Sequence, residues 1–184
     1  MDFFLIRHAP AVDRAEAPTD AVRPLSDRGR RRFRKAVAGM EALDLSLDLV
    51  LHSPWRRAVE TAELLAPLLS RAAASDPLVA TELLAQTPDR ALLALMREPP
   101  PARLDDGGEA PRANAIALVG HEPWMSELLS LMLTGDRAHA DATPFKKGGV
   151  AWLRPRAQGE RADLVAFLPP RLLRRLGQVD EVIG

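Results

Sequence analysis

Short runs of apolar residues alternate along the chain with longer stretches in which apolar residues recur every three or four positions. Three of the short runs have the length and composition of buried strands: residues 3–6, 48–51 and 115–120. Three of the longer stretches have the spacing of amphipathic helices: residues 27–43, 54–70 and 123–135. Strands that alternate with helices in this order predict an α/β fold with a mostly parallel central sheet.

Weaker elements complete the pattern. They are a strand at 77–80, a helix that opens at Thr87-Pro88-Asp89 and ends near Arg97, two strands at 149–153 and 163–168 with a turn around Gly159, and a helix at about 170–176. The sequence shows neither an internal repeat nor a linker. We therefore predict one domain over residues 1–184, folded as a three-layer α/β/α sandwich.

The three buried runs end on side chains that are costly to bury. The first run ends at Arg7-His8, the second leads through His52 to Arg56-Arg57, and the third ends at His121. In open α/β sheets, ligands bind at the carboxyl ends of the parallel strands. We therefore expect Arg7, His8, one of the two neighbouring arginines and His121 to converge at one edge of the sheet.

Two guanidinium groups and two imidazoles are suited to a tetrahedral dianion such as a phosphoryl group. Arginine donors match phosphate oxygens in paired hydrogen bonds, and a neutral histidine can attack phosphorus to form a covalent phosphohistidine. Arginine cannot ligate a metal, and the chain has no cysteine, so we expect neither a metal nor a cofactor. This set of residues predicts phosphoryl transfer.

Composition excludes several other classes of protein. The 25 basic and 25 acidic residues give a formal net charge of zero, so no bulk field favours nucleic acid. No apolar run approaches the roughly 20 residues that span a bilayer, and the first residues do not resemble a signal peptide. We expect a cytoplasmic protein. The basic run between Arg28 and Lys35 is interpreted as a solvated helix face or, alternatively, as a docking surface for an acidic partner.

Four segments of the chain resemble a known family. Arg7-His8-Ala9 resembles the Arg-His-Gly signature of the histidine phosphatase superfamily, which has the phosphoglycerate mutase-like fold. Three other segments follow in the order of that family: Ser53 to Ala62, Val119 to Pro123, and Phe145 to Ala151. Together with the short length and Arg23-Pro24-Leu25-Ser26, they make the chain most similar to the small bacterial protein phosphohistidine phosphatases.

The resemblance implies roles for individual residues. His8 would be the nucleophile, and Arg7, Arg57 and His121 would bind the phosphoryl group. The family pattern Ser-Pro-x-x-Arg-Ala selects Arg57 over Arg56. The flanking arginines favour a neutral His8, whereas His121 would gain from being protonated beside a bound dianion.

Expectations for Ser53, for Ala9 and for the residue that protonates the leaving group complete the predicted site. Ser53 is expected to cap the helix that follows it, and Ala9 stands where the family has glycine. The group that protonates the leaving group is open. Glu82 occupies about the position of a catalytic glutamate in larger members, and Asp13 is the other candidate.

The expected activity is hydrolysis of phosphohistidine in a protein through a covalent intermediate on His8. A phosphatase for a small phosphorylated metabolite is the nearest alternative, because it would use the same pocket and mechanism. A mutase is disfavoured because residues 71–114 leave little chain for a lid. The complete set of four residues also disfavours a non-catalytic phosphate-binding module. The expected partner is thus a phosphorylated protein or a small phosphorylated molecule, and neither nucleic acid nor a membrane.

Overall fold

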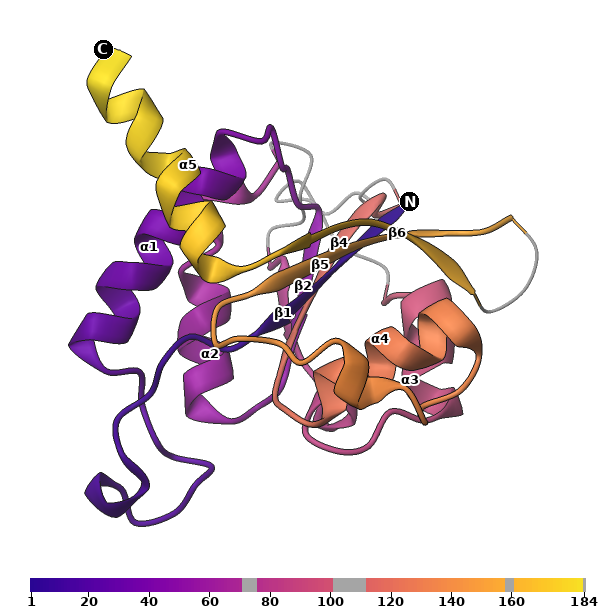
Figure 1. Cartoon of the computed structure of the whole chain (residues 1–184). Helices are drawn as coiled ribbons and strands as arrows, with labels where there is room; N and C mark the ends of the chain where they lie inside the picture. Colours follow the sequence, from indigo (N-terminus) through magenta and orange to yellow (C-terminus); the bar gives the residue numbers. More distant parts are fainter. Residues whose placement is uncertain (71–75, 101–111, 158–160, 184) are drawn as a thin grey trace.

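A six-stranded sheet forms the centre of the molecule in the computed structural model, which describes residues 1–70, 76–100, 112–157 and 161–183 (Figure 1). The strand order is β3 (Leu78–Ala80), β2 (Leu49–His52), β4 (Ala115–Gly120), β1 (Asp2–Arg7), β5 (Val150–Pro155) and β6 (Ala162–Leu168). Neighbouring strands from β3 to β1 are parallel, and β5 and β6 run antiparallel to their neighbours. The predicted mostly parallel sheet is confirmed.

Helices cover both faces of this sheet, which confirms the three-layer sandwich. Side chains alternate between the faces along each strand, so Phe4 and Ile6 of β1 pack on one side and Phe3 and Leu5 on the other. The first face is covered by α1 (Asp27–Glu41), α2 (Arg56–Glu63) and α5 (Pro170–Ile183). The second face is covered by α3 (Arg90–Arg97) and α4 (Trp124–Thr134) (Figure 1). The central strands are therefore apolar on both faces, which explains their continuous hydrophobic runs.

Two helix boundaries follow the sequence signals. The Ser26 hydroxyl accepts a hydrogen bond from the Gly29 amide at 3.0 Å and caps α1. Gly135 ends α4 with φ of 84°, a left-handed conformation that glycine adopts without strain. The cap of α3 is Asp89, whose carboxylate accepts from the Leu92 amide at 3.0 Å, so this helix begins later than Thr87.

The helix predicted at 54–70 is shorter than expected. It runs from Arg56 to Glu63 and is followed by a separate 3-10 turn, η2 (Ala66–Leu68). Pro67 accounts for the break, because a proline ring in a continuing α-helix would clash with the carbonyl of Glu63, four residues earlier. Three further 3-10 turns lie in the connections: η1 (Arg14–Glu16), η3 (Glu82–Leu84) and η4 (Ala140–Ala142).

The last helix is longer than the predicted 170–176 and continues through Gly177 to Ile183. Gly177 lies against α1, where an added β-carbon would stand 2.6 Å from the Gly39 amide nitrogen. A β-carbon on Gly39 would likewise stand 1.9 Å from the Leu173 carbonyl oxygen. The two glycines therefore let α1 and α5 pack backbone against backbone, and this packing reaches Gly177, the first residue beyond the predicted end of the helix.

Two observations complete the fold. Strands β5 and β6 pair as the predicted hairpin, and its turn at Gly159 lies outside the described residues. None of the helices in the described ranges is long and apolar enough to cross a membrane.

Candidate active site

Two neighbouring parallel strands place Arg7, His8 and His121 at the same edge of the sheet. Arg7 is the last residue of β1 and is paired with Gly120, the last residue of β4. The amide of His8 donates to the Gly120 carbonyl at 2.9 Å, and the rings of His8 and His121 lie 5.1 Å apart. Arg57, in the first turn of α2, donates from Nε to His8 Nε2 at 3.1 Å. The structure thus brings together the four residues that the sequence singles out.

Hydrogen bonding defines the tautomer of His8. Its Nδ1 lies 2.7 Å from the Ala9 carbonyl oxygen, which can only accept, so we assign the proton to Nδ1. Nε2 then carries a lone pair and accepts from Arg57. Burial lowers the pKa of His8 well below its usual range, and the charges of Arg57 and Arg7 lower it further. His8 is therefore neutral as expected, although burial contributes more than the arginines do.

The turn after β1 is tied to α2 through Thr61. The Ala9 amide donates to the Thr61 hydroxyl at 3.0 Å, and this hydroxyl donates to the Arg57 carbonyl at 2.6 Å. Thr61 and Ala9 are both fully buried. Ala9 has no positive φ, so its β-carbon introduces no backbone strain where the family has glycine. This pair of bonds holds the nucleophile candidate in register with Arg57.

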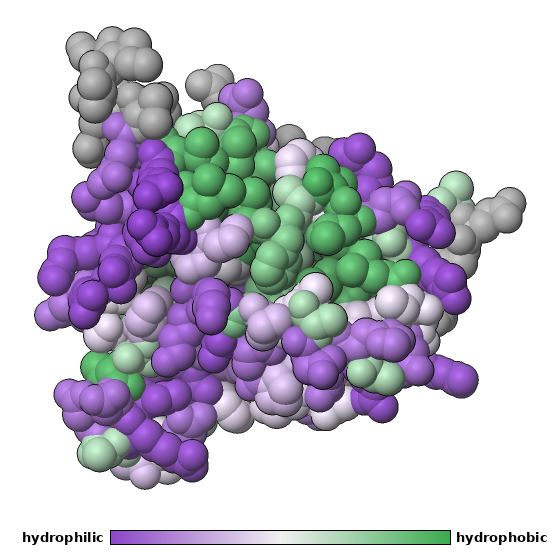
Figure 2. Space-filling view, viewed as in Figure 1, coloured by the Kyte–Doolittle hydropathy of each residue, from purple (hydrophilic) through white to green (hydrophobic). Residues whose placement is uncertain are grey.

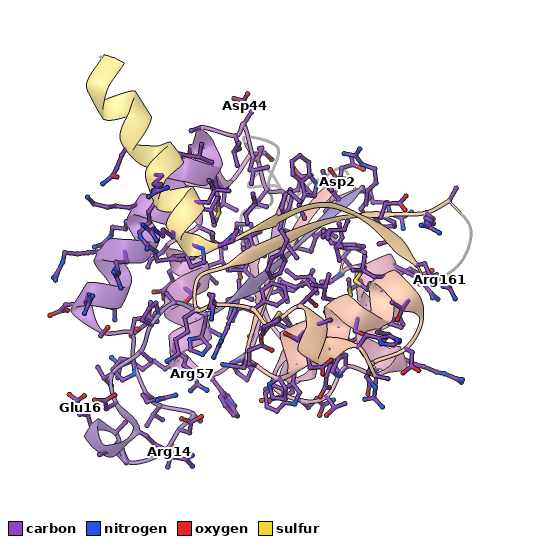
Figure 3. The ribbon with its side chains drawn as sticks, in the orientation of Figure 1. Asp2, Arg14, Glu16, Asp44, Arg57 and Arg161 are labelled. Carbon is purple, nitrogen blue, oxygen red and sulfur yellow. The ribbon has the colours of Figure 1, made fainter. Side chains whose placement is uncertain are left out.

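Asp20 holds the guanidinium group of Arg57. Arg57 Nη1 donates to the Asp20 carbonyl at 2.6 Å and Nη2 donates to the Asp20 carboxylate at 2.9 Å. Burial alone would raise the pKa of Asp20, but the charge and hydrogen bond of Arg57 and the charge of Arg23 hold it below its usual range. Asp20 belongs to the segment between β1 and α1, which projects from the body beside Arg57 (Figures 1 and 3).

Arg7 is fixed by the segment that precedes β5. Its Nη1 donates to the Phe145 carbonyl at 2.5 Å. The Glu122 carboxylate holds the same segment, because it accepts from the Phe145 amide at 2.6 Å and from the Ser126 hydroxyl at 2.8 Å. Burial lowers the pKa of Arg7, and the charge of Glu122 opposes this shift. Arg7 Nε is buried and has no hydrogen-bond partner within the described residues.

His121 stands in an aromatic setting. Its ring centroid lies 4.6 Å from that of Trp55 and 5.9 Å from that of Trp124, and both tryptophans are half-buried. Burial, followed by the charge of Arg57, lowers the pKa of His121 to about 3. His121 is therefore neutral in the unliganded protein, so the expected protonated form would require a bound anion. Its Nδ1 is buried and unpartnered within the described residues.

Ser53 does not cap α2, which corrects the sequence expectation. Trp55 occupies the N-cap position with an extended backbone, and the helix begins at Arg56. The Ser53 hydroxyl instead accepts from the Trp55 amide at 3.2 Å and lies 2.8 Å from His121 Nε2. Ser53 is fully buried, so its hydroxyl orients the His121 ring rather than a helix end.

The two candidate proton donors do not join this cluster. Glu82 opens η3 and is exposed, and no hydrogen bond or ion pair connects it to the four residues in the described part of the chain. Asp13 is also exposed, and its amide donates to the Glu16 carboxylate at 2.9 Å. Arg56 points away from the cluster and pairs with Glu60 at 3.0 Å, with 58% of its side chain exposed.

The donor set of the cluster is suited to an anion. Arg7, Arg57 and His121 present nitrogen donors, and the unpartnered Arg7 Nε and His121 Nδ1 add two buried nitrogens that a ligand oxygen can satisfy. Across the described ranges, no three histidine or acidic residues gather in a way that could hold a metal ion.

Comparison with known proteins identifies the family. The model of the histidine phosphatase superfamily (branch 1) matches residues 3–85, which include Arg7, His8 and Arg57. An uncharacterized protein from Picosynechococcus sp. is 32% identical over 154 residues, covering 84% of this chain and 85% of the relative. The chain belongs to the histidine phosphatase superfamily.

Solved structures of phosphatases share the fold of this superfamily member. The protein histidine phosphatase SixA, solved in complex with tungstate, has a TM-score of 0.69 at 21% identity and covers 94% of this chain and 99% of its own. The alpha-ribazole phosphatase from Shigella flexneri has a TM-score of 0.63 at 19% identity and covers 92% of this chain and 97% of its own. The printed names of these two phosphatases give different substrates, so the shared architecture shows the fold and leaves the substrate to the site.

Proposed function

We propose that this protein is a phosphatase that hydrolyses phosphohistidine in a protein substrate, through a covalent phosphohistidine on His8. The observation that carries the proposal is the state of His8. The ring is neutral, its Nδ1 proton is held by the Ala9 carbonyl, and its Nε2 lone pair lies 3.1 Å from Arg57 Nε and beside His121. In-line attack by this lone pair requires that Arg57 Nε release His8 Nε2 and donate instead to an oxygen of the bound phosphoryl group.

The reaction then has two steps. His8 Nε2 attacks phosphorus while the bond from phosphorus to the leaving nitrogen breaks, and the electron pair of that bond returns to the leaving imidazole. A water molecule next attacks the phosphohistidine, its oxygen stays on phosphorus, and Nε2 recovers its electron pair. Arg7, Arg57 and His121 stabilise the charge on the equatorial oxygens in both steps.

The carboxylates near the site support phosphohistidine over a phosphate ester. Asp20 is bound to Arg57, Glu122 is bound to the Phe145 amide and Ser126, and Glu82 forms no hydrogen bond or ion pair with the cluster in the described part of the chain. An alkoxide leaving group needs such an acid, whereas an imidazole protonated on its second nitrogen leaves as a neutral molecule. A site without a free carboxylic acid beside the nucleophile is therefore suited to a phosphoramidate bond.

One observation favours a second candidate, a phosphatase for a small phosphorylated metabolite. Trp55 and Trp124 lie edge to face, with ring centroids 5.8 Å apart, and both contact His121. Half-buried indoles beside the phosphate donors can stack on a flat ring of a small substrate. They can equally stack on the imidazole of a phosphohistidine, so the choice between the two substrates rests on the leaving-group argument above.

A substrate panel tests the proposal. We expect kcat/KM for a histidine-phosphorylated protein and for phosphoramidate to exceed that for phosphoserine and sugar phosphates. A quenched reaction should carry phosphate on His8 that is lost in acid and stable in base, and His8→Ala should abolish this adduct. Preferential hydrolysis of phosphate esters would favour the small-metabolite candidate, and an adduct on any other residue would refute the mechanism.

A further inference from the structure

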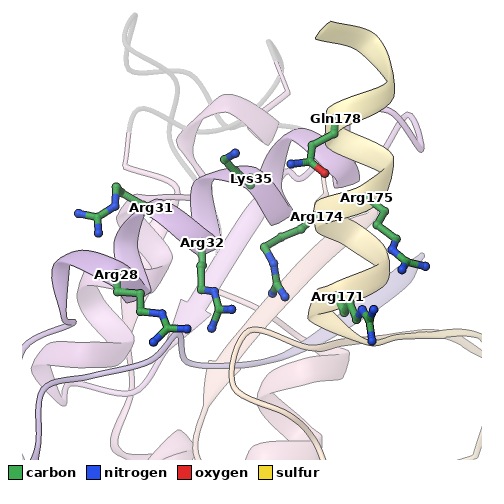
Figure 4. A pocket seen from close by; sticks show the side chains of 8 residues that line it. All are labelled: Arg28, Arg31, Arg32, Lys35, Arg171, Arg174, Arg175 and Gln178. Atoms are coloured by element: carbon green, nitrogen blue, oxygen red, sulfur yellow. The ribbon is translucent and has the colours of Figure 1, made fainter. Parts of the chain in front are cut away.

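A groove outside the candidate active site is lined almost entirely by cations. It encloses about 540 Å³ between α1 and α5 (Figure 4). Its lining consists of seven basic side chains and one glutamine: Arg28, Arg31, Arg32, Lys35, Arg171, Arg174, Arg175 and Gln178. Among the side chains described, which end at Gln178 in α5, no acidic residue lines the groove and none of the seven cations forms an ion pair. We call this surface the basic groove.

The basic groove is built by two helical stripes with the same spacing. Residues 28, 31, 32 and 35 of α1 and residues 171, 174, 175 and 178 of α5 each follow the i, i+3, i+4, i+7 pattern of one helix face. Each stripe extends over about 10 Å at 1.5 Å per residue. Gly39 and Gly177 allow the close packing of the two helices, which brings the stripes together.

The positive charges that line the basic groove repel one another, and this repulsion is unfavourable for the free energy of folding. The pKa of Arg174 lies below its usual range because of burial and of the neighbouring charges of Arg32 and Arg171. Like charges gathered without counter-charges repel, and a bound anion would relieve the repulsion. The formal net charge of the chain is zero, so this surface is a local concentration of positive charge rather than a consequence of composition. Figure 2 shows the hydrophilic surface over α1 and α5.

A second hollow adjoins the basic groove, and its lining reaches Gly148, beside the backbone of Arg7 and His8. This hollow of about 250 Å³ shares Arg32 and Arg174 with the basic groove and is also lined by Lys146 and Lys147. The next residue, Gly148, donates from its amide to the carbonyls of Arg7 and His8 at 3.0 and 3.2 Å. Burial and the charges of Arg7, Arg23 and Arg57 lower the pKa of Lys147, so this lysine bridges the two positive regions.

We propose that the basic groove docks an acidic surface segment of the phosphoprotein whose phosphohistidine enters the candidate active site. This inference rests on the proposed function and extends it, because it names the feature by which a protein substrate is recognised. A small phosphoramidate cannot reach the groove and the nucleophile together, so only a macromolecular substrate benefits from it. Charge on such a surface mainly raises the rate of productive encounter.

The lining favours a protein over other polyanions. Surfaces that bind single-stranded nucleic acid interleave cations with exposed aromatic rings, and the basic groove has no aromatic residue in its lining. Helices that lie on membranes present apolar side chains beside their cations, and none lines this groove. Carboxylates of an acidic segment need only the dense arginine donors that the groove supplies.

Two peptides and two double variants test the proposal. Each peptide contains one histidine phosphorylated by phosphoramidate, and they differ only in a tail of six glutamates or six serines. Arg31→Glu with Arg175→Glu reverses charge inside the basic groove. Arg34→Glu with Arg90→Glu is the matched control, because it changes net charge equally at exposed arginines that do not line the groove. Melting temperatures confirm that each variant is folded.

In the wild type and the control, we expect kcat/KM for the glutamate-tailed peptide to exceed that for the serine-tailed peptide by about tenfold at low salt. The ratio of the two values should fall at high salt, because salt screens exposed charges. The groove variant should lose this preference and still hydrolyse free phosphoramidate at the wild-type rate. A preference that persists in the groove variant, or that falls equally in the control, would overturn the proposal.

A binding measurement separates this inference from the proposed function. Fluorescence anisotropy with the unphosphorylated peptides reports docking whether or not the phosphorylated peptides are hydrolysed. If hydrolysis fails but the glutamate-tailed peptide binds through the groove, the proposed function is wrong and the acidic docking surface stands. If a single-stranded oligonucleotide binds through the groove and the glutamate-tailed peptide does not, the acidic-protein assignment is wrong.

Discussion

Arg57 and Arg56 are adjacent in sequence but have opposite environments, which makes them a sharp test of the site. Arg57 is 3% exposed, donates to His8 Nε2 and is held by Asp20 and by the face of Trp55, whose centroid lies 4.7 Å from the guanidinium carbon. Arg56 has 58% of its side chain exposed and pairs only with Glu60. Arg57→Ala should therefore remove a desolvated donor to the transferring phosphoryl group, whereas Arg56→Ala should remove a solvated charge.

The expected magnitudes differ widely. Loss of one preorganised donor to a developing charge typically lowers turnover by about 10²–10³, or about 3–4 kcal/mol of transition-state stabilisation. Arg56→Ala should change turnover by less than about twofold and stability by less than about 1 kcal/mol, as for exposed ion pairs. Glu60 keeps its hydrogen bond from the Leu25 amide at 2.6 Å and its ion pair with Arg30 at 2.7 Å.

Single-turnover kinetics with phosphoramidate provide the assay, because they separate formation of the His8 adduct from its breakdown. Arg57→Lys is a useful third variant. A lysine keeps the charge but presents its donors from a single nitrogen and not from the three guanidinium nitrogens that reach His8 and Asp20, so we expect an intermediate loss. Arg57 would not be the donor to the phosphoryl group if Arg56→Ala were the slower enzyme, or if Arg57→Ala kept a turnover within tenfold of the wild type.

Three further outcomes follow from the site. Lowering the pH from 8 to 5 should reduce the free energy of unfolding by about 2 kcal/mol through His121, because its pKa of about 3 in the fold lets only the unfolded chain bind the proton. Urea unfolding of His121→Gln should show a correspondingly smaller dependence on pH, and an unchanged dependence would contradict the assignment. Activity should survive excess chelator, and a loss that magnesium restores would contradict a site built on arginine and histidine. Asp20→Asn should lower the inhibition constant of inorganic phosphate by more than the about twofold to fivefold that corresponds to an exposed ion pair, since it removes a negative charge beside the buried Arg57. Weaker inhibition would show that Asp20 acts mainly by positioning Arg57.

The sequence predicts the central part of the site because that part depends on local patterns and on the topology of parallel strands. Continuous apolar runs identify β1 and β4, and adjacent parallel strands must end at the same edge of the sheet. Arg7, His8 and His121 therefore have to meet. The proline and the helical spacing after β2 bring the Arg56-Arg57 pair to the same edge, but the choice of Arg57 comes from the resemblance to the family pattern Ser-Pro-x-x-Arg-Ala.

The supporting residues are harder to find because their roles depend on contacts distant in sequence. Asp20 lies in a turn-rich segment with no periodic pattern, and it is 37 residues away from the guanidinium group that it holds. Thr61 does carry a signal, since it lies one helical turn after Arg57. Glu82 stays a prediction, because its sequence position suggests a proton donor and the fold leaves it exposed at the start of η3.

The basic run of α1 is visible in the sequence, but the sequence alone does not decide its function. The stripe in α1 is evident from the sequence, which favours a solvated face and leaves a docking surface as the alternative. The choice depends on what faces the stripe, and that is decided by Gly39 and Gly177. Because these glycines bring α1 and α5 together, a second cationic stripe lies opposite the first in place of the carboxylates that would neutralise a solvated face. The described side chains thus form a cationic surface that reaches, through Lys146 and Lys147, the segment that follows Phe145 and contacts the backbone of His8, and an acidic substrate protein could bind along it.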